Sequence, residues 1–345
     1  MNFSDFDAII DARTPAEFAE DHIPGAISAP VLYDVERAEV GTLYKQVSAF
    51  EAKKVGAELV ARNVARHIKV LFSDKPKTWC PLVYCWRGGK RSGAMAHILR
   101  EIGWDAQTLP GGYKAYRKWV VQQLEIVPQQ FDFRVVHGPT GSGKSRLLAA
   151  LARAGAQVLD LEALAAHRGS VLGGLPDRPQ PSQKMFESCL LKALSVLEKE
   201  KPVFVEGESK KIGQLQVSEA LIARMRAAAC VRLETDSETR VTLLLQEYEF
   251  FLQNQENLYQ QLDCLVSLHG REKIADWKAL AARGDWREFV ARLLAEHYDP
   301  AYRRSSHKNF VRLADARSVR IAADDEAAFA RAAQSLLAGA ELQPA

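Results

Sequence analysis

Residues 131–154 read F-D-F-R-V-V-H-G-P-T-G-S-G-K-S-R-L-L-A-A-L-A-R-A, and this stretch decides the fold of the second half of the chain. The apolar run that ends at His137 predicts a strand, and the spacing of leucine and alanine after Lys144 predicts a helix. Strand and helix patterns continue to alternate beyond it, which is typical of a parallel sheet covered by helices. The strands are predicted at residues 131–137, 157–160, 202–206 and 230–234, and the helices at 144–154, 182–200 and 214–227.

The first half of the chain shows the same alternation. The pattern is interrupted by E-I-V-P-Q-Q at residues 125–130, and the length of 345 residues is enough for two domains with a core each. We therefore predict an α/β protein with one domain at 1–126 and another at 127–345. In the first domain, strands are predicted at residues 7–13, 68–73 and 81–85, and helices at 50–66 and 92–102.

The loop between the strand and the helix of the opening stretch fits the spacing G-x-x-x-x-G-K-[ST]. Its backbone N–H groups are expected to bind a diphosphate, Lys144 to neutralise the terminal charge, and Ser145 to place its hydroxyl on a magnesium ion. The predicted diphosphate-binding residues are Gly138, Thr140, Gly141, Ser142, Gly143, Lys144, Ser145 and Glu206.

Glu206 ends an apolar strand, the place where a loop of this kind needs an acid to organise magnesium and water. Glu208 follows it closely, and Asp160 and Glu162 after the preceding strand are further candidates for balancing the charge. The alternative for Glu206 is a solvated strand end. Such a loop recognises phosphates rather than a base, so the ligand must be argued separately.

Cys85 follows a predicted strand and begins C-W-R-G-G-K-R-S, after which a helical pattern starts at once. The glycines let several backbone N–H groups point inward, and the helix adds the positive end of its dipole. These surroundings favour the thiolate, the form of cysteine that attacks. The predicted catalytic residues are Cys85, Arg91, Arg87 and Lys90; the alternative for Cys85 is a buried strand end, which is also our interpretation of Cys80, Cys189, Cys230 and Cys264.

Composition narrows the class of protein. The chain has 46 Lys and Arg against 43 Asp and Glu, a net charge of +3, which excludes binding of nucleic acid through bulk positive charge alone. Five cysteines without C-x-x-C spacing predict neither a disulfide framework nor a zinc site, and they favour a reducing cytoplasm. The histidines show no spacing typical of metal ligands, so we expect no structural metal. No signal peptide and no membrane-spanning segment are expected.

The first domain resembles the rhodanese family. The resemblance rests on D-A-R at residues 11–13, E-F at 17–18, H-I-P-G-A at 22–26 and a closing L-P-G-G-Y…W at 109–119. It implies that Cys85 handles a transferable chalcogen and that Asp11 and Arg13 shape the domain. The loop departs from most sulfurtransferases because five residues separate Cys85 from Arg91. Phosphatase and arsenate-reductase relatives share this length, which suits a tetrahedral anion such as selenophosphate.

The second domain looks like a P-loop NTPase-like domain, and its G-P-T-G-S-G-K-S is similar to the loop of tRNA dimethylallyltransferases, which hold a prenyl diphosphate. No kinase-like base-recognition motif is present, so a prenyl diphosphate and ATP are level alternatives. Across the whole chain, the fusion resembles the bacterial tRNA 2-selenouridine synthase family. The resemblance rests on D-L-E-A-L-A-A-H-R-G-S at 160–170, F-V-E-G-E-S-K-K-I-G at 204–213 and H-Y-D-P-A-Y at 297–302.

This resemblance implies a transferase with two steps. Geranyl diphosphate first geranylates the wobble 2-thiouridine of tRNA at the P-loop, and selenium from selenophosphate then replaces the geranylthio group in a step that needs Cys85. It implies tRNA as a partner, and a selenophosphate-producing enzyme as a supplier. The alternatives are a C-x5-R phosphatase or arsenate-reductase-like enzyme with an accessory nucleotide-binding domain, and a non-catalytic rhodanese and P-loop binding module.

From Arg240 onward the chain reads as a mostly helical extension, in which Trp277 and Trp286 have spacings that suit helix packing. Between residues 302 and 320 it carries six Lys or Arg against one acid, with aromatic residues interleaved. Phosphate contacts and stacking on unpaired bases would use that mixture, although an exposed basic face is the alternative. The predicted tRNA-binding residues are Arg303, Arg304, Lys308, Lys210 and Lys211, with Arg168 as a further contact and His167 as the histidine considered for the site.

Overall fold

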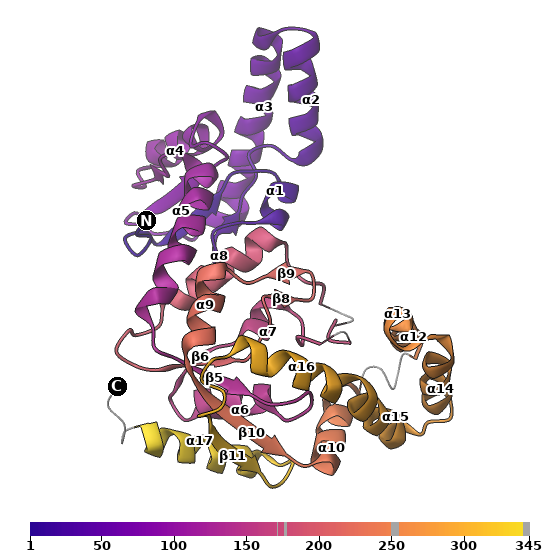
Figure 1. Cartoon of the computed structure of the whole chain (residues 1–345). Coiled ribbons are helices and arrows are strands. Elements are labelled where there is room, and N and C mark those ends of the chain that lie inside the picture. Colours follow the sequence, from indigo (N-terminus) through magenta and orange to yellow (C-terminus); the bar gives the residue numbers. More distant parts are fainter. Residues whose placement is uncertain (171, 176–177, 250–254, 341–345) are drawn as a thin grey trace. The chain divides into compact units, whose positions relative to one another are not determined.

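The computed structural model describes residues 1–170, 172–175, 178–249 and 255–340, with the side chains of 305–309 and 339–340 left out (Figure 1). It divides into two compact units, Met1–Gln123 with Ser182–Lys192, and Leu124–Pro181 with Ala193–Ala345. Each unit contains a parallel sheet with helices packed on it, which confirms the predicted α/β class. Among the described residues, none of the helices is both long and apolar enough to cross a membrane.

The sheet of the first unit has the order β2 (Ile27–Ser28), β1 (Ala8–Asp11), β3 (Pro81–Tyr84) and β4 (Gln107–Thr108), with every pair parallel. Its side chains pack with those of α4 (Lys90–Ile102) in one buried cluster. Helix α1 (Pro15–Glu20) follows β1, and α5 (Gly112–Ile126) follows β4. The chain therefore delivers Cys85 at the carboxyl end of the central strand β3, directly before α4.

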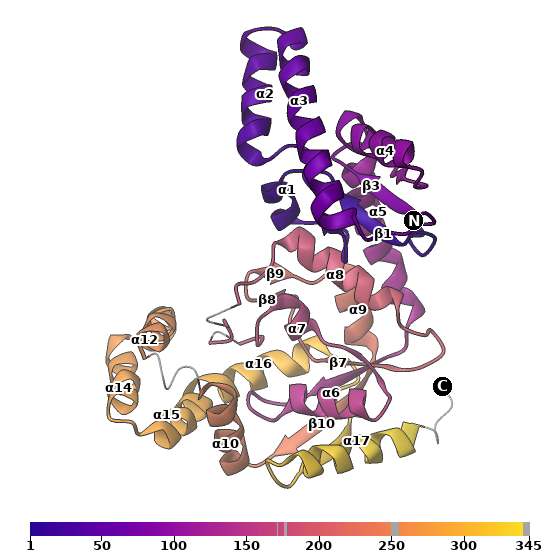
Figure 2. The same ribbon diagram turned by 180° about the vertical axis from the view of Figure 1, so that it is seen from behind.

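One predicted strand of this unit is wrong. Residues 68–73 form the π-helix η1 (Ile68–Phe72), which continues α3 (Ala49–His67) without a break. Val64, Ile68 and Phe72 are spaced by four residues, so the apolar side chains share one helix face and join the core of the unit. The local run I-K-V-L-F resembles a strand only when this longer period is ignored. Helices α2 (Asp34–Gln46) and α3 lie side by side in both views (Figures 1 and 2).

The sheet of the second unit has the order β11 (Arg317–Ile321), β10 (Ala229–Thr235), β5 (Phe133–His137), β7 (Val203–Glu206) and β6 (Gln157–Leu159), again all parallel. Helices α6 (Lys144–Arg153) and α17 (Glu326–Ala340) pack together on it and bury one cluster of apolar side chains (Figure 2). The four strands predicted here are confirmed. Strand β11 was not expected, because it lies in the extension that reads as helical.

Two helices differ from their predicted bounds. The segment 214–227 begins with β9 (Leu215–Gln216), which forms a hairpin with the preceding β8 (Lys211–Ile212). Helix α9 (Glu219–Ala227) starts only after Ser218, which caps its first turn. Helix α8 (Gln183–Ser195) is shorter than 182–200, and its first part belongs to the first unit. Arg117 of α5 forms an ion pair with Glu187 of α8 there. The predicted domain boundary between residues 126 and 127 therefore does not account for Ser182–Lys192, which belong to the first unit.

The extension folds as a second helical core within the second unit. Trp277 is fully buried in it and Trp286 packs against it, as their spacing predicted. The other elements in the described part of the chain are η2 (Val127–Gln130), α7 (Leu161–Ala165), α10 (Ser237–Glu247), α12 (Gln255–Asp263), α13 (Val266–His269), α14 (Arg271–Ala282), α15 (Trp286–Leu293), η3 (Leu294–Tyr298) and α16 (Asp299–Asn309).

Candidate active sites

The Cys85 thiol lies at the end of β3, only 4% exposed, beneath the loop that leads into α4. The Ser92 hydroxyl donates to its sulfur over 3.2 Å. Burial by itself raises the pKa of the thiol, but hydrogen bonds from Ser92 and from the backbone N–H groups of Gly89 and Arg87 outweigh it and lower the pKa below its ordinary value. The thiolate form of Cys85 is therefore favoured by neutral hydrogen-bond donors, which together form the donor cradle of this site.

The basic side chains of this loop are placed differently from one another. Arg87 and Lys90 are exposed to solvent. Arg91 is half-buried and donates to both carboxylate oxygens of Glu17, at 2.8 and 3.4 Å. Although burial opposes it, this pairing holds the pKa of Glu17 below its usual value. The positive charge of Arg91 is balanced by Glu17, so less charge reaches an anion at Cys85 than the sequence suggests.

The loop at Cys85 is held by the start of α5. The backbone N–H groups of Tyr113 and Lys114 donate to the carbonyls of Cys85 and Trp86, at 2.8 and 3.0 Å. Gly112 has a φ of +57°, and a Cβ there would come within 2.2 Å of the Cys85 carbonyl oxygen. Only glycine fits this position. The L-P-G-G segment at residues 109–112 and the start of α5 therefore hold the cysteine loop in place through backbone contacts.

Asp11 and Arg13 form a buried ion pair at 2.6 Å, and Arg13 also donates to the carbonyl of Asp21. Arg13 is 1% exposed, and its guanidinium stacks 3.8 Å from the centre of the Tyr113 ring. These contacts tie β1 to the segment after α1 and to α5. Their geometry is that of a structural ion pair inside the unit.

The P-loop, residues 138–145, lies at the carboxyl end of β5. From β5 the chain proceeds to β6 and β7 on one side and then to β10 on the other, which makes this edge a topological switch point. Gly141 and Gly143 have φ values of +77° and +85°, which lets the loop curl. Two side chains hold the loop from outside: Arg240 donates to the Thr140 carbonyl at 2.8 and 3.0 Å, and Thr235 donates to the Ser142 carbonyl at 2.9 Å.

Three carboxylates face Lys144 across the loop. Carboxylate oxygens of Glu162, Glu206 and Glu208 lie within 4.8 Å of one another, and the Ser145 hydroxyl donates to Glu162 at 3.3 Å. Neither carboxylate oxygen of the fully buried Glu206 has a hydrogen-bond partner among the described residues. Hard oxygen ligands in this number fit a divalent cation. The predicted Glu206 is thus joined by Glu208 and Glu162, whereas Asp160 caps α7 by accepting from the Ala163 N–H.

The charges in this cluster shift one another. Burial and repulsion by the neighbouring carboxylates raise the pKa of Glu206 to about 7 and of Glu162 to about 9, although Lys144 opposes the shift. Burial disfavours the charge of Lys144, but the three carboxylates raise its pKa. A bound cation would favour the ionised acids, because it supplies positive charge that Lys144 alone does not.

A cavity of about 340 Å³ opens above the P-loop. The three segments that carried the whole-chain resemblance all reach it. Segment 160–170 supplies Glu162 and Arg168, segment 204–213 supplies Glu208, and segment 297–302 supplies Tyr298 and Tyr302. Asp299 contributes indirectly, since it accepts from Arg240 at 2.6 Å. Segments more than one hundred residues apart in the chain therefore build one site.

The predicted tRNA-binding residues lie on two elements, α16 and the segment at β8. Arg303 and Arg304 are exposed on α16, directly after the cavity-lining Tyr302. Lys210 is paired with Glu219, and Lys211 is exposed at the start of β8. The side chain of Lys308 lies outside the described residues. The basic residues between 302 and 320 continue from α16 into the edge strand β11, so they do not all lie on one helix.

Several site residues were missed by the sequence analysis. Ser92 follows Arg91 directly, and its position on the first turn of α4 is the signal that points to the thiol. No local sequence signal points to Arg240 of α10 or Thr235 of β10. Both contact the P-loop from about 100 residues away in sequence. His167, which was considered, is buried and does not line the cavity described above.

Comparison with known families agrees with these two sites. The rhodanese-like domain family matches residues 1–118, and the tRNA 2-selenouridine synthase AAA domain matches residues 131–277. These matches cover both the cysteine loop and the P-loop. The predicted combination of a rhodanese-like domain with a P-loop domain is confirmed.

Curated relatives bear the same name across three organisms. The tRNA 2-selenouridine synthase of Sulfurovum sp. is 33% identical over 336 residues, which covers 88% of this chain and 90% of the relative. Those of Nitrosomonas europaea and Bdellovibrio bacteriovorus are each 37% identical over 70% of this chain. The chain spans 63% and 64% of the length of these two relatives.

Proposed function

Because the chain belongs to the tRNA 2-selenouridine synthase family, we propose that it converts the wobble 2-thiouridine of tRNA to 2-selenouridine in two steps. The observation that carries the proposal is that each unit holds one candidate site and that the two sites differ in chemistry. One holds Lys144 against three carboxylates, and the other holds the Cys85 thiol in a cradle of hydrogen-bond donors. We place the protein in the cytoplasm, where tRNA and reduced thiols are found.

The first step uses the P-loop. The thiocarbonyl sulfur attacks the first carbon of geranyl diphosphate, the sulfur–carbon bond forms, and the carbon–oxygen bond to the diphosphate breaks. The base loses its N3 proton, which leaves neutral S-geranyl-2-thiouridine. Lys144 and the loop N–H groups stabilise the charge that develops on the departing diphosphate. A magnesium ion held by Ser145, Glu206, Glu208 and Glu162 would supply further positive charge at this diphosphate.

The second step uses Cys85. Alkylation has turned the sulfur into part of a leaving thiol, so the selenium of selenophosphate can replace it at C2. The C2–selenium bond forms, the C2–sulfur bond breaks, and geranylthiol departs with a proton. Water then cleaves the selenium–phosphorus bond and releases phosphate. Cys85, Ser92 and the loop N–H groups bind or relay selenophosphate, while the exposed Arg87 and Lys90 attract it.

The proposal is tested by separating the two steps. Purified full-length protein is incubated with thiolated tRNA, geranyl diphosphate and selenophosphate, and the wobble nucleosides are identified by mass spectrometry. Cys85→Ala should abolish selenation and leave geranylation measurable. Lys144→Ala should reduce geranylation about 100-fold or more, yet still selenate tRNA that was geranylated beforehand. Cys80→Ala and Lys201→Ala are matched controls, because neither side chain lies at a site.

The contrary results are equally specific. Loss of geranylation in Cys85→Ala, or normal geranylation in Lys144→Ala, would show that the steps are not divided in this way. Release of phosphate from a simple phosphoester without tRNA would favour the phosphatase or arsenate-reductase alternative. Absence of both modified nucleosides and of phosphate release with the unaltered protein would leave only the binding-module alternative.

A further inference from the structure

A second cavity lies against the P-loop, and its walls are apolar. Most of its lining residues come from α10, α12, α15 and η3, the helices of the extension core. No charged side chain is found among the described residues that line it. Its walls are formed by Leu172, Leu245, Leu258, Trp286, Phe289, Val290, Leu293 and Leu294, together with four residues that it shares with the cavity above the P-loop.

Four residues line both cavities, so the two cavities adjoin. Thr140 belongs to the P-loop itself, Leu244 lies on α10, Tyr248 directly follows α10, and Tyr298 comes from η3. The Tyr248 hydroxyl lies 3.4 Å from the hydroxyl of Ser170, on the side of the P-loop cavity. The Tyr248 hydroxyl thus has a polar partner that lines the P-loop cavity. A ligand whose phosphates bind the P-loop would therefore have its hydrocarbon part beside the apolar cavity.

The size of the cavity limits what it can hold. Its volume is about 60 Å³. That is several times the roughly 10–15 Å³ of probe volume that one water molecule needs, so the cavity holds only a small group. A base or a sugar would leave its polar atoms without partners here, whereas a hydrocarbon loses nothing by leaving water.

We propose that this cavity binds the distal isoprene unit of geranyl diphosphate and thereby sets the length of the prenyl chain. This inference rests on the proposed function, which it extends to a specific subsite. The diphosphate and the first isoprene unit occupy the larger cavity beside Lys144. Only the second unit enters the apolar cavity, so a chain of ten carbons fills it and a chain of five does not reach it.

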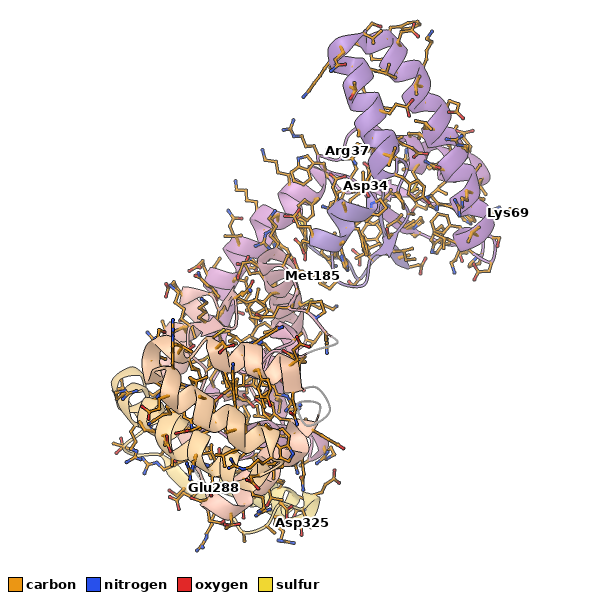
Figure 3. The ribbon with its side chains drawn as sticks, turned by 90° about the vertical axis from the view of Figure 1, so that its right-hand side faces the viewer. Asp34, Arg37, Lys69, Met185, Glu288 and Asp325 are labelled. Atoms are coloured by element: carbon orange, nitrogen blue, oxygen red, sulfur yellow. The ribbon has the colours of Figure 1, made fainter. Side chains whose placement is uncertain are left out.

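Helix α15 supplies the wall at which chain length can be altered. Trp286, Phe289, Val290 and Leu293 recur at helical spacing and all line the cavity. The opposite face is in solvent, where Glu288 (labelled in Figure 3) accepts from Arg292 at 2.7 Å. Val290 is half-buried, so a larger side chain there projects into the cavity without displacing the fully buried residues of the core.

The test measures binding by calorimetry in the presence of magnesium. Full-length protein is titrated with inorganic diphosphate, dimethylallyl diphosphate, geranyl diphosphate and farnesyl diphosphate. Geranyl diphosphate should bind about tenfold or more tightly than dimethylallyl diphosphate, and farnesyl diphosphate should gain nothing further. Val290→Trp should reduce geranyl diphosphate to about the affinity of dimethylallyl diphosphate and leave inorganic diphosphate unchanged. Val196→Trp adds the same bulk at a site that is 68% exposed and serves as the control.

Each contrary result has its own meaning. Equal binding of inorganic and geranyl diphosphate by the unaltered protein would overturn the subsite and leave the diphosphate site standing. Unchanged geranyl diphosphate binding in a folded Val290→Trp variant would do the same. If Val290→Trp does not unfold cooperatively, Leu245→Phe fills the cavity from α10 and must give the same loss. Failure of the unaltered protein to bind either ligand would overturn the proposed function as well.

Discussion

Glu206 shows how a single buried residue couples the charge of the P-loop site to stability. Its folded pKa of about 7, and that of about 9 for Glu162, lie above the ordinary carboxyl value of 4.5 because of burial and mutual repulsion. A raised pKa means that the folded chain holds these protons more tightly than the unfolded chain. The contribution to stability is therefore full below about pH 4.5 and is lost as the pH rises through the folded values.

We expect the free energy of unfolding to fall between about pH 5 and about pH 9 when no ligand is bound. Glu206→Gln should flatten this dependence, since an amide cannot ionise, and magnesium with inorganic diphosphate should flatten it in the unaltered protein. Denaturant unfolding measured across this range checks both effects. Glu198→Gln, at an exposed ion pair with Lys201, is the control and should keep the slope. An unaltered slope in Glu206→Gln would contradict the assignment of this charge cluster.

At the scale of elements, the start of α5 positions the cysteine loop through backbone contacts. A Cβ at Gly112 would come within 2.2 Å of the Cys85 carbonyl oxygen and 2.3 Å of the Gly88 nitrogen, and φ is +57° there. Gly93, in the first turns of α4, is different because a Cβ there meets nothing within 4 Å. The same substitution at the two glycines therefore separates the fit of the loop from the general effect of adding a methyl group.

Gly112→Ala should lower the free energy of unfolding by about 1–3 kcal/mol or more and raise the pKa of the Cys85 thiol, because the loop N–H groups move away from the sulfur. Gly93→Ala should be neutral or stabilise by about 0.5–1 kcal/mol, with the thiol pKa unchanged. Denaturant unfolding and the ultraviolet absorbance of the thiolate against pH measure the two quantities. If Gly112→Ala folds and the pKa of its Cys85 thiol is unchanged, α5 does not position the loop N–H groups around the sulfur.

At the scale of the whole molecule, the net charge is small, but basic side chains are still exposed next to the P-loop cavity. Arg303 and Arg304 are exposed beside a residue that lines the P-loop cavity, and they are our candidates for tRNA phosphate contacts. Replacing both with Gln should weaken tRNA binding and reduce its salt slope by about one to two, since each phosphate contact releases counterions. Filter binding across a range of salt concentrations measures this.

The matched control for that pair is Arg287→Gln, an exposed arginine on α15 that pairs with Glu238. It removes the same kind of charge from the same unit without approaching the cavity. Full affinity and an unchanged salt slope in the Arg303 and Arg304 variant would exclude this part of α16 from the tRNA-binding surface.

The sequence by itself determined the two α/β cores, the P-loop and the Cys85 loop, because each is encoded by residues that are neighbours in the chain. Periodicity finds a strand or helix, and glycine spacing finds a loop, without any distant contact. The same local reasoning was wrong at residues 68–73, where the apolar pattern extends the long helix α3. It also missed β11, which is a strand because β10 offers it a parallel partner.

Only the tertiary structure decided which charges meet. Arg91 is neutralised by Glu17, Glu162 joins Glu206 and Glu208, and Arg240 holds the P-loop from α10. It also decided that residues 182–192 pack in the first unit, which no linear boundary can express. The physical reason is common to all of these. Electrostatic and hydrogen-bonding partners are chosen by distance in space and by exclusion of water, and a sequence pattern records neither.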